Sequence, residues 1–278
     1  MRTTAYGGLF ALVTALAMLV LVRLLNGALR FVRGDRGTAG RAIVEACQTV
    51  SVLALSGSIV GGVARGDDLR QDAAWVAISA AVCAALLVGL GRVSAMTLVG
   101  GKAKDEIARG NLAAAIAVGA HQVALGLLLS HCVYGRDFGS IGVAVAFFAI
   151  GFVTLHALVV AFRALTSYDD AQEVLGENVA AATSYAGVVV GLAVLIGHAA
   201  DGPFLGWRAS LVQYAVAVSF AVLSWPVRQL VVQTLLLGEP VRLARGGLDL
   251  RIARERDLAA AFVESGSYVA TALMASAL

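Results

Sequence analysis

The sequence has little charge for its length. Asp, Glu, Lys and Arg make up 14% of its 278 residues, whereas 59% of the residues are hydrophobic. A soluble domain usually carries about 25% charged residues. The composition therefore argues against an ordinary soluble globular protein.

Cysteine, proline and catalytic motifs are also scarce. The three cysteines, Cys47, Cys83 and Cys132, form no CxxC pair, which favours small buried side chains over a disulfide or a zinc site. The chain has no P-loop, no GxSxG and no HxxxH pattern. We predict no enzyme activity, no metal and no cofactor. Membrane topology explains the basic residues, so we predict no nucleic-acid partner.

Long hydrophobic runs are what the sequence has in abundance. A run of about 20 residues crosses the ~30 Å hydrocarbon core of a bilayer as a helix. The runs predict an all-α, polytopic transmembrane helix bundle of about eight helices, over residues 6–33, 39–64, 72–99, 105–133, 138–167, 172–199, 208–237 and 250–277. The lipid bilayer is the first predicted partner.

The basic residues are unevenly placed along these helices. Sixteen of the 21 Lys and Arg residues lie in or beside the segments that join helices 1–2, 3–4, 5–6 and 7–8. The positive-inside rule places those segments in the cytoplasm. Both termini are then predicted to lie outside the cytoplasm.

A repeated pattern marks the even-numbered helices. A polar residue is followed nine and thirteen residues later by small residues, which let helices approach closely in lipid. The polar anchors are Gln48, Asn111, Asn178 and Asp257, and the small pairs are Gly57 and Gly61, Ala120 and Ala124, Gly187 and Gly191, and Gly266 and Ala270. We predict four parallel helical hairpins, in which an Asn or Asp anchor at a helix start can cap free backbone N–H groups and the even helices are the inner ones.

The odd-numbered helices carry a matching signal late in each helix. Four arginines occupy this position: Arg23, Arg92, Arg163 and Arg228. One interpretation is that they bind anionic lipid or ligand, or pair with Glu45, Glu106, Glu177 and Asp257. The other is that they extend to the cytoplasmic headgroups.

Two strings resemble a known family. "FRALTSYDDAQEVLGENVAAATSYAGVVVGLAVLIGHA" and "MTLVGGKAKDEIARGNLAAAIAVGAHQVALGLLLSH" resemble the DUF350 family of bacterial inner-membrane proteins, on a Thr-x-Tyr-Asp-like turn, an acid, and Asn before an alanine-rich helix. The resemblance implies a bacterial inner-membrane location and about four helices per domain, here residues 1–135 and 136–278. It implies no particular activity. Gln48 and Asp257 depart from the family's asparagine.

Glu264 is the most unusual residue in a predicted span. An acid within a membrane is costly and is usually functional or paired. Glu264 lies about 10 Å deeper than Asp257, with Tyr268 one turn further and Tyr185 at the equivalent place in the third hairpin. This favours either a proton or cation site or a carboxyl group that fixes the bundle.

Two histidines also interrupt apolar helices. His156 fits a proton relay, although a histidine in such a place is more often hydrogen-bonded to a neighbouring helix. His121 lies next to Gln122 in a similar setting.

These features favour two functions. The first is a channel or transporter for a small ion or solute, with the four hairpins around a central path. The alternative is a non-catalytic membrane scaffold, or a partner-binding subunit of an envelope-stress system. Self-association and a membrane or cytoplasmic protein partner fit either function.

Overall fold

The structure is a computed structural model that describes residues 4–28, 39–230, 234, 238 and 246–277. Within those residues every regular element is helical. The elements are α1 (Thr4–Ala28), α2 (Ala39–Val63), α3 (Leu69–Val99), η1 (Gly100–Lys102), α4 (Ala103–Ala108), α5 (Leu112–Cys132), α6 (Phe138–Arg163), α7 (Asp170–Leu175), α8 (Val179–Ala199), α9 (Trp207–Leu230), α10 (Gly247–Ala253) and α11 (Leu258–Ser276).

Seven helices in the described part of the chain are long and apolar enough to cross a membrane: α1, α2, α3, α5, α6, α8 and α11. This confirms the predicted polytopic helix bundle. The remaining predicted span, 208–237, corresponds to α9, and residues 231–233 and 235–237 fall outside the described residues.

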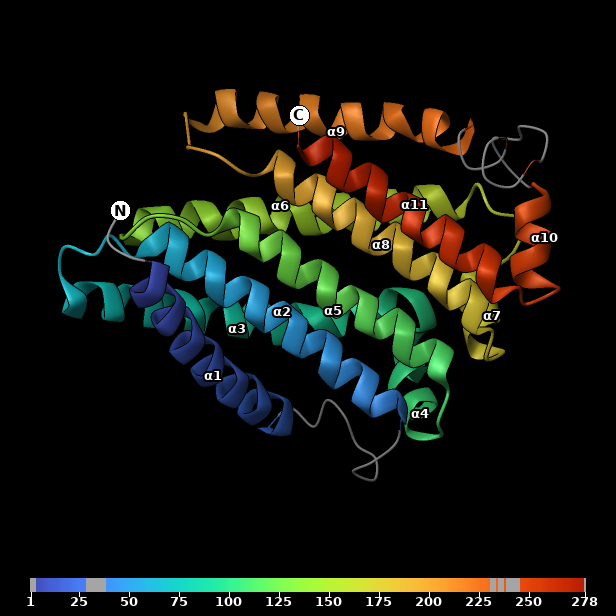
Figure 1. The fold of residues 1–278 in the computed structure, drawn as a ribbon, viewed down its shortest axis with the longest axis horizontal. Helices are drawn as coiled ribbons and strands as arrows, with labels where there is room; N and C mark the ends of the chain where they lie inside the picture. Colours follow the sequence, from blue (N-terminus) through green and yellow to red (C-terminus); the bar gives the residue numbers. More distant parts are fainter. Residues whose placement is uncertain (1–3, 29–38, 231–233, 235–237, 239–245, 278) are drawn as a thin grey trace.

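The four helices α2, α5, α8 and α11 lie side by side in one row (Figure 1). Helix α5 packs along α2 and α8, and α8 packs in turn along α11. Helices α2 and α11 are thus the two edges of an open row. The prediction of hairpins around a central path is wrong, because sequential hairpins pack as neighbours without closing into a ring.

The other long helices cover this row. Helices α3 and α6 lie behind it, where α3 packs on α5, and α6 packs on both α5 and α8. Helix α1 contacts α2 and α3 near one edge, and α9 contacts α8 and α11 near the other. The centre of the row is therefore the most buried part of the molecule, which is where a shielded polar site can form.

Three of the predicted helices are each broken in two. The segments 105–133, 172–199 and 250–277 consist of a short helix (α4, α7 or α10), a turn, and a long helix (α5, α8 or α11). The residue before each long helix's cap is in the left-handed region, with φ of 98° at Gly110, 63° at Glu177 and 52° at Arg256. Such a residue ends a helix. Only Gly110 signals the break in the sequence.

The predicted small-residue pairs differ with their place in the row. Ala120 and Ala124 are buried on α5. On α8, a Cβ added to Gly187 would lie 2.3 Å from Ser265 Cα, and one added to Gly191 would lie 3.0 Å from the Tyr268 carbonyl oxygen. Close packing of α8 on α11 therefore requires glycine at both positions.

At the two edges of the row the small residues have no such role. A Cβ added to Gly57 or Gly61 on α2, or to Gly266 on α11, would meet nothing within 4 Å, and Ala270 is exposed. The prediction that all even helices are inner is therefore wrong for α11, which has a row neighbour on one side only.

Gln48 lies within α2, well after the helix begins at Ala39. The capping role predicted for the Asn and Asp anchors therefore does not extend to this residue, and the repeat register that includes it stays a prediction.

The two predicted domains, 1–135 and 136–278, share one core. Helix α5 from the first and α8 from the second pack along each other, and a single cluster of buried apolar side chains includes residues from both. The boundary between the two stays a prediction.

Candidate functional site

The turns between short and long helices lie at one end of the molecule (Figure 1). The side chains of Asn111, Asn178 and Asp257 cap α5, α8 and α11. Each accepts a hydrogen bond from the backbone N–H three residues on, at 3.0, 3.2 and 3.0 Å. The predicted capping role is confirmed for these three residues, and in each of them the capping oxygen is committed to the backbone.

The two asparagines also join neighbouring turns. Asn111 Nδ2 donates to the Val174 carbonyl oxygen of α7 at 2.9 Å. Asn178 Nδ2 donates to the Ile252 carbonyl oxygen of α10 at 3.0 Å. Both asparagines are almost fully buried. An aspartate such as Asp257 accepts but cannot donate when ionised, so the third turn lacks this kind of link.

Arginines reinforce these turns from the surface. Arg109 pairs with Glu106 at 2.6 Å and with Glu177 at 3.3 Å. Arg109 Nη2 also donates to the Leu175 carbonyl oxygen, and Arg256 Nη2 donates to the Gly176 carbonyl oxygen. Helices α4, α7 and α10 are thereby connected in one rim.

The four acids named as possible partners of the late-helix arginines each pair with another arginine among the described residues. Glu45 pairs with Arg41, Glu106 and Glu177 pair with Arg109, and Asp257 pairs with Arg251. These acids lie at helix ends, where arginines of the turns are nearer. Of the four late-helix arginines, Arg23 is exposed, Arg92 is half-buried, and the Arg228 side chain lies outside the described residues.

Arg163 differs from those arginines because it faces a buried acid. Its Nε atom lies 3.1 Å from Asp170 Oδ2, and Nη2 lies 3.6 Å from Asp169 Oδ1. Its guanidinium carbon lies 5.9 Å from the centre of the Tyr185 ring. An open pocket of about 300 Å³ borders Arg163, Tyr168, Asp169 and Asp170. The pocket brings solvent to a partly buried ion pair.

Asp170 lies on the short helix α7, outside the spans, yet it is 3% exposed. Burial raises its pKa to about 6, although the positive charge and hydrogen bond of Arg163 act in the opposite direction. The nearby Glu264 contributes to the rise. Asp170 therefore changes its charge near physiological pH.

Glu264 reaches the same region from α11. It is buried, and Ser184 Oγ on α8 donates to its Oε2 atom at 2.6 Å. Burial raises the pKa of Tyr168, and the charges of Asp170 and Glu264 act in the same direction. Glu264, Asp170 and Arg163 thus belong to one cluster, which we call the Arg163 cluster, together with Tyr168, Asp169 and Ser184.

Two other predicted site residues lie elsewhere. Tyr268 is half-buried on α11, with its ring edge-on to Phe162 at 6.3 Å between centroids. Gln48 Oε1 accepts a hydrogen bond from Asn26 Nδ2 at 3.0 Å, and Gln48 Nε2 donates to Gln122 Oε1 at 3.5 Å. The predicted ion-site residues therefore divide into caps, a glutamine cluster, the Arg163 cluster with Tyr185 beside it, and Tyr268, which packs against Phe162.

A chain of histidine and hydroxyl groups lies between the row and the helices behind it. Ser94 Oγ on α3 is 2.6 Å from His121 Nδ1 on α5 and 2.9 Å from His156 Nε2 on α6. His121 Nε2 is 2.7 Å from Tyr185 Oη on α8. The sequence marked His121, His156 and Tyr185 separately. Their shared partner Ser94 depends on packing and carried no signal.

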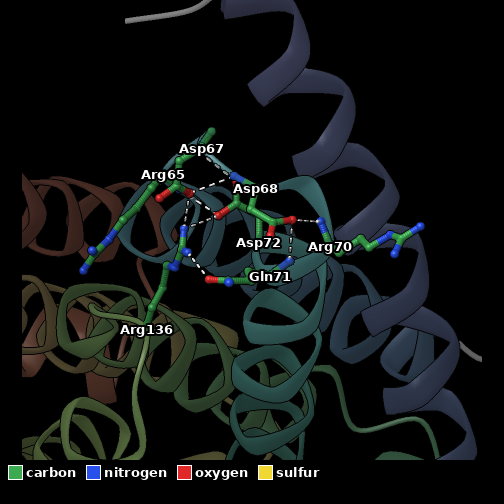
Figure 2. A network of polar contacts seen from close by, with 8 residues as sticks. Arg65, Asp67, Asp68, Arg70, Gln71, Asp72 and Arg136 are labelled. Carbon is green, nitrogen blue, oxygen red and sulfur yellow. Dashed lines mark hydrogen bonds and ion pairs between the residues drawn. The ribbon is translucent and has the colours of Figure 1, made fainter.

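A separate polar network closes the opposite end of the molecule (Figure 2). Asp72, 3% exposed, accepts from the backbone N–H groups of Arg65 and Gly66 and from Arg136 Nη1. Arg136 also forms a hydrogen-bonded ion pair with Asp67, and this interaction lowers the pKa of the Asp67 carboxyl group. The network ties the α2–α3 turn to the α5–α6 turn, and all three of these hydrogen bonds to Asp72 are structural.

The fold and these buried polar clusters define a multi-pass helical membrane protein. A family model matches residues 68–143 and 137–278, and its description is Domain of Unknown Function (DUF350). The chain therefore belongs to the DUF350 family, with two copies of the domain, as the sequence resemblance predicted. Comparisons with curated proteins and with solved structures gave no match.

Proposed function

We propose that this protein moves a small ion or small solute across the bacterial inner membrane. The observation that carries the proposal is the buried polar assembly inside an apolar bundle. The Arg163 cluster and the histidine chain meet where the Arg163 guanidinium lies over the Tyr185 ring. Polar and ionisable groups within spanning helices are costly and commonly mark ion or proton pathways.

The pathway in this proposal runs between two layers of helices. His156 is on α6 and Ser94 on α3, behind the row, whereas His121 and Tyr185 are on α5 and α8 within it. The pocket beside Arg163 lies at the end of the molecule that carries the short helices. An off-centre path of this kind needs no closed ring of helices.

The proposal includes the predicted topology of four parallel hairpins. Three capped turns with a left-handed residue before the cap support the repetition. The arginine-rich turns gather around α4, α7 and α10, and the marked chain ends lie away from those helices (Figure 1). Under the positive-inside rule, the pocket faces the cytoplasm and the termini face outward.

Ion flux in proteoliposomes tests this function. Purified protein is exposed to imposed H⁺, Na⁺ and K⁺ gradients, and wild type is compared with Glu264→Gln and Asp170→Asn. We expect flux above that of empty vesicles and a loss of about tenfold in each variant, because a hydrogen bond to a charged group contributes about 1.5–3 kcal/mol. Glu255→Gln, an exposed acid at the end of α10, is the matched control.

The outcomes separate function from site. Absence of flux for all three ions, from wild-type protein that is folded in the vesicles, contradicts the transport proposal. Flux that survives both Glu264→Gln and Asp170→Asn keeps transport but removes the Arg163 cluster from the path.

The open row favours one alternative, a membrane scaffold that binds further copies or another membrane or cytoplasmic protein. Large apolar side chains are exposed on α11, a helix at one edge of the row, including Phe262, Leu273 and Met274. Chemical cross-linking in native membranes, followed by identification of the linked species, tests this function. It becomes the leading function if flux is absent and a defined cross-linked partner is found.

A further inference from the structure

The histidine chain has a direction that its chemistry fixes. His156 Nδ1 lies 2.8 Å from the Phe152 carbonyl oxygen, which can only accept a hydrogen bond. His156 Nδ1 must therefore carry a proton. In the neutral ring His156 Nε2 is then an acceptor, so Ser94 Oγ donates to it.

The remaining hydrogen bonds follow from this start. Ser94 has one hydroxyl proton, and it is committed to His156, so His121 Nδ1 must donate to Ser94 Oγ. His121 Nε2 is then an acceptor, and it receives the Tyr185 hydroxyl proton. All three donors between Tyr185 and His156 point the same way, from α8 toward α6.

Protonation of His156 reverses the whole chain without moving a heavy atom. An imidazolium at His156 donates from Nε2, so Ser94 must donate to His121 Nδ1, and His121 Nε2 must donate to Tyr185 Oη. The chain therefore has two complete hydrogen-bonded states. They differ by one proton and by the direction of every bond.

We propose that Tyr185, His121, Ser94 and His156 form an oriented proton wire that carries protons from the side of Tyr185 next to Arg163 to His156. The wire rests on the proposed transport function and names its ion, the proton. The Arg163 guanidinium carbon lies 5.9 Å from the Tyr185 ring centre, and the proposal requires a water molecule to reach the Tyr185 hydroxyl from that side. This water protonates the Tyr185 oxygen as that oxygen releases its own proton to His121. His121 passes its Nδ1 proton to Ser94, and Ser94 passes its proton to His156 Nε2.

The transfer conserves protons and follows the hydrogen bonds already described. Each intermediate oxygen or nitrogen group gives one proton and receives one, and the net change is one proton lost by the water at Tyr185 and gained by His156. His121 is 1% exposed and Ser94 is 0% exposed. Bulk water therefore cannot exchange protons with the middle of the wire. The charges that act on His121 are those of His156 and Arg163.

The first test observes the wire directly. The chain has four histidines, so ¹⁵N-histidine NMR of the full protein in bilayers is tractable. His131→Gln and His198→Gln assign the two signals outside the wire. We expect His121 and His156 both to be Nδ1–H at neutral pH. Wherever the spectrum shows His156 doubly protonated, His121 is expected to be Nε2–H.

Two conservative variants test transport through the wire. Ser94→Ala and Tyr185→Phe each remove one hydroxyl oxygen, and we expect each to lower proton flux by about tenfold or more, since a positioned proton-transfer group contributes about 10²–10⁴-fold. Ser51→Ala is the matched control, because Ser51 is buried and bonds the Gln122 carbonyl oxygen on α5 outside the wire. Ser94→Ala is also expected to uncouple His121 from His156 in the NMR titration.

The outcomes distinguish the wire from the proposed function. Nε2–H on either histidine in neutral wild type overturns the wire. Proton flux unchanged in folded Ser94→Ala and Tyr185→Phe also overturns it and leaves transport standing. No flux of any ion in wild type overturns the proposed function, and with it the wire's role in transport. Thermal unfolding of each variant in detergent verifies that it is folded.

Discussion

Helices α8 and α11 begin alike and pack differently. Each follows a short helix and a left-handed residue, and each is capped by a side chain that bonds the backbone three residues on. In the most apolar 18 residues of each, 67% are buried in α8 and 17% in α11. The difference comes from the row, in which α8 has a neighbour on both sides and α11 on one.

The comparison shows that the same local design serves two purposes. Asn178, before α8, caps its own helix and also donates to α10, whereas Asp257, before α11, caps its helix and pairs with Arg251. A helix within the row thus needs a donor at its cap, because a neighbouring turn lies against it. A helix at the edge needs only an acceptor.

The cap residues provide the largest expected contrast. Asn178→Ala removes a cap and a buried bond to α10, which together are expected to cost about 3 kcal/mol of unfolding free energy. Asp257→Ala removes a cap and a partly exposed ion pair, so we expect a clearly smaller loss of unfolding free energy. Reversible unfolding in mixed micelles measures both values. Equal losses would contradict the distinction between inner and edge turns.

Glycine substitutions sharpen the comparison along the helices. In Gly187→Ala the new Cβ would lie 2.3 Å from Ser265 Cα, and such overpacking is expected to cost about 2 kcal/mol. In Gly266→Ala the Cβ meets nothing within 4 Å, so better helix propensity is expected to stabilise α11 by up to about 1 kcal/mol. Thermal unfolding midpoints of the two variants should move in opposite directions. A loss of stability in Gly266→Ala would show that a partner covers that edge.

The smallest expected effect is the pH dependence of the free energy of unfolding, which comes from the acids of the short helices. Burial raises the pKa of Asp170 before α8 and of Asp249 before α11, to about 6 for Asp170. The folded state therefore binds the Asp170 proton more tightly than the unfolded chain, whose pKa is near 3.9. This contribution favours folding at low pH and is lost as pH rises from about 4 through 6.

Unfolding midpoints of wild type and Asp170→Asn, measured from pH 4.5 to 7.5, test this sign. The wild-type midpoint should fall relative to that of the variant as pH rises through about 6. A parallel pair of curves would show that Asp170 does not titrate in this range.

Much of the fold could be predicted from sequence, because apolar runs and single polar anchors are local signals. The caps at Asn111, Asn178 and Asp257 followed from residue type and position. The helix breaks did not, since Glu177 and Arg256 adopt positive φ without a glycine to announce it. The open row did not follow either, because hairpin order gives neighbours and leaves closure undetermined.

The candidate site was predictable only in part. Glu264 stood out as an acid in an apolar run, and Tyr185 as its counterpart in another hairpin. Asp170 gave no signal, because its burial depends on how α7 packs against the end of the row. Ser94 is one of many serines, and only the packing of α3 against α5 and α6 places it between two histidines.

The rim of short helices has a mechanical consequence. α7 is attached on one side through Asn111 and Arg109, and on the other through Asn178 and Arg256. It also carries Asp170, whose pKa is raised to about 6. A displacement of α7 on proton uptake would be transmitted to α4 and α10 together, so that one ionisation would be coupled to three helix starts. By linkage, a ligand whose affinity for the rim depends on the charge of Asp170 shifts the proton affinity of Asp170 by the same free energy by which protonation shifts the ligand's affinity.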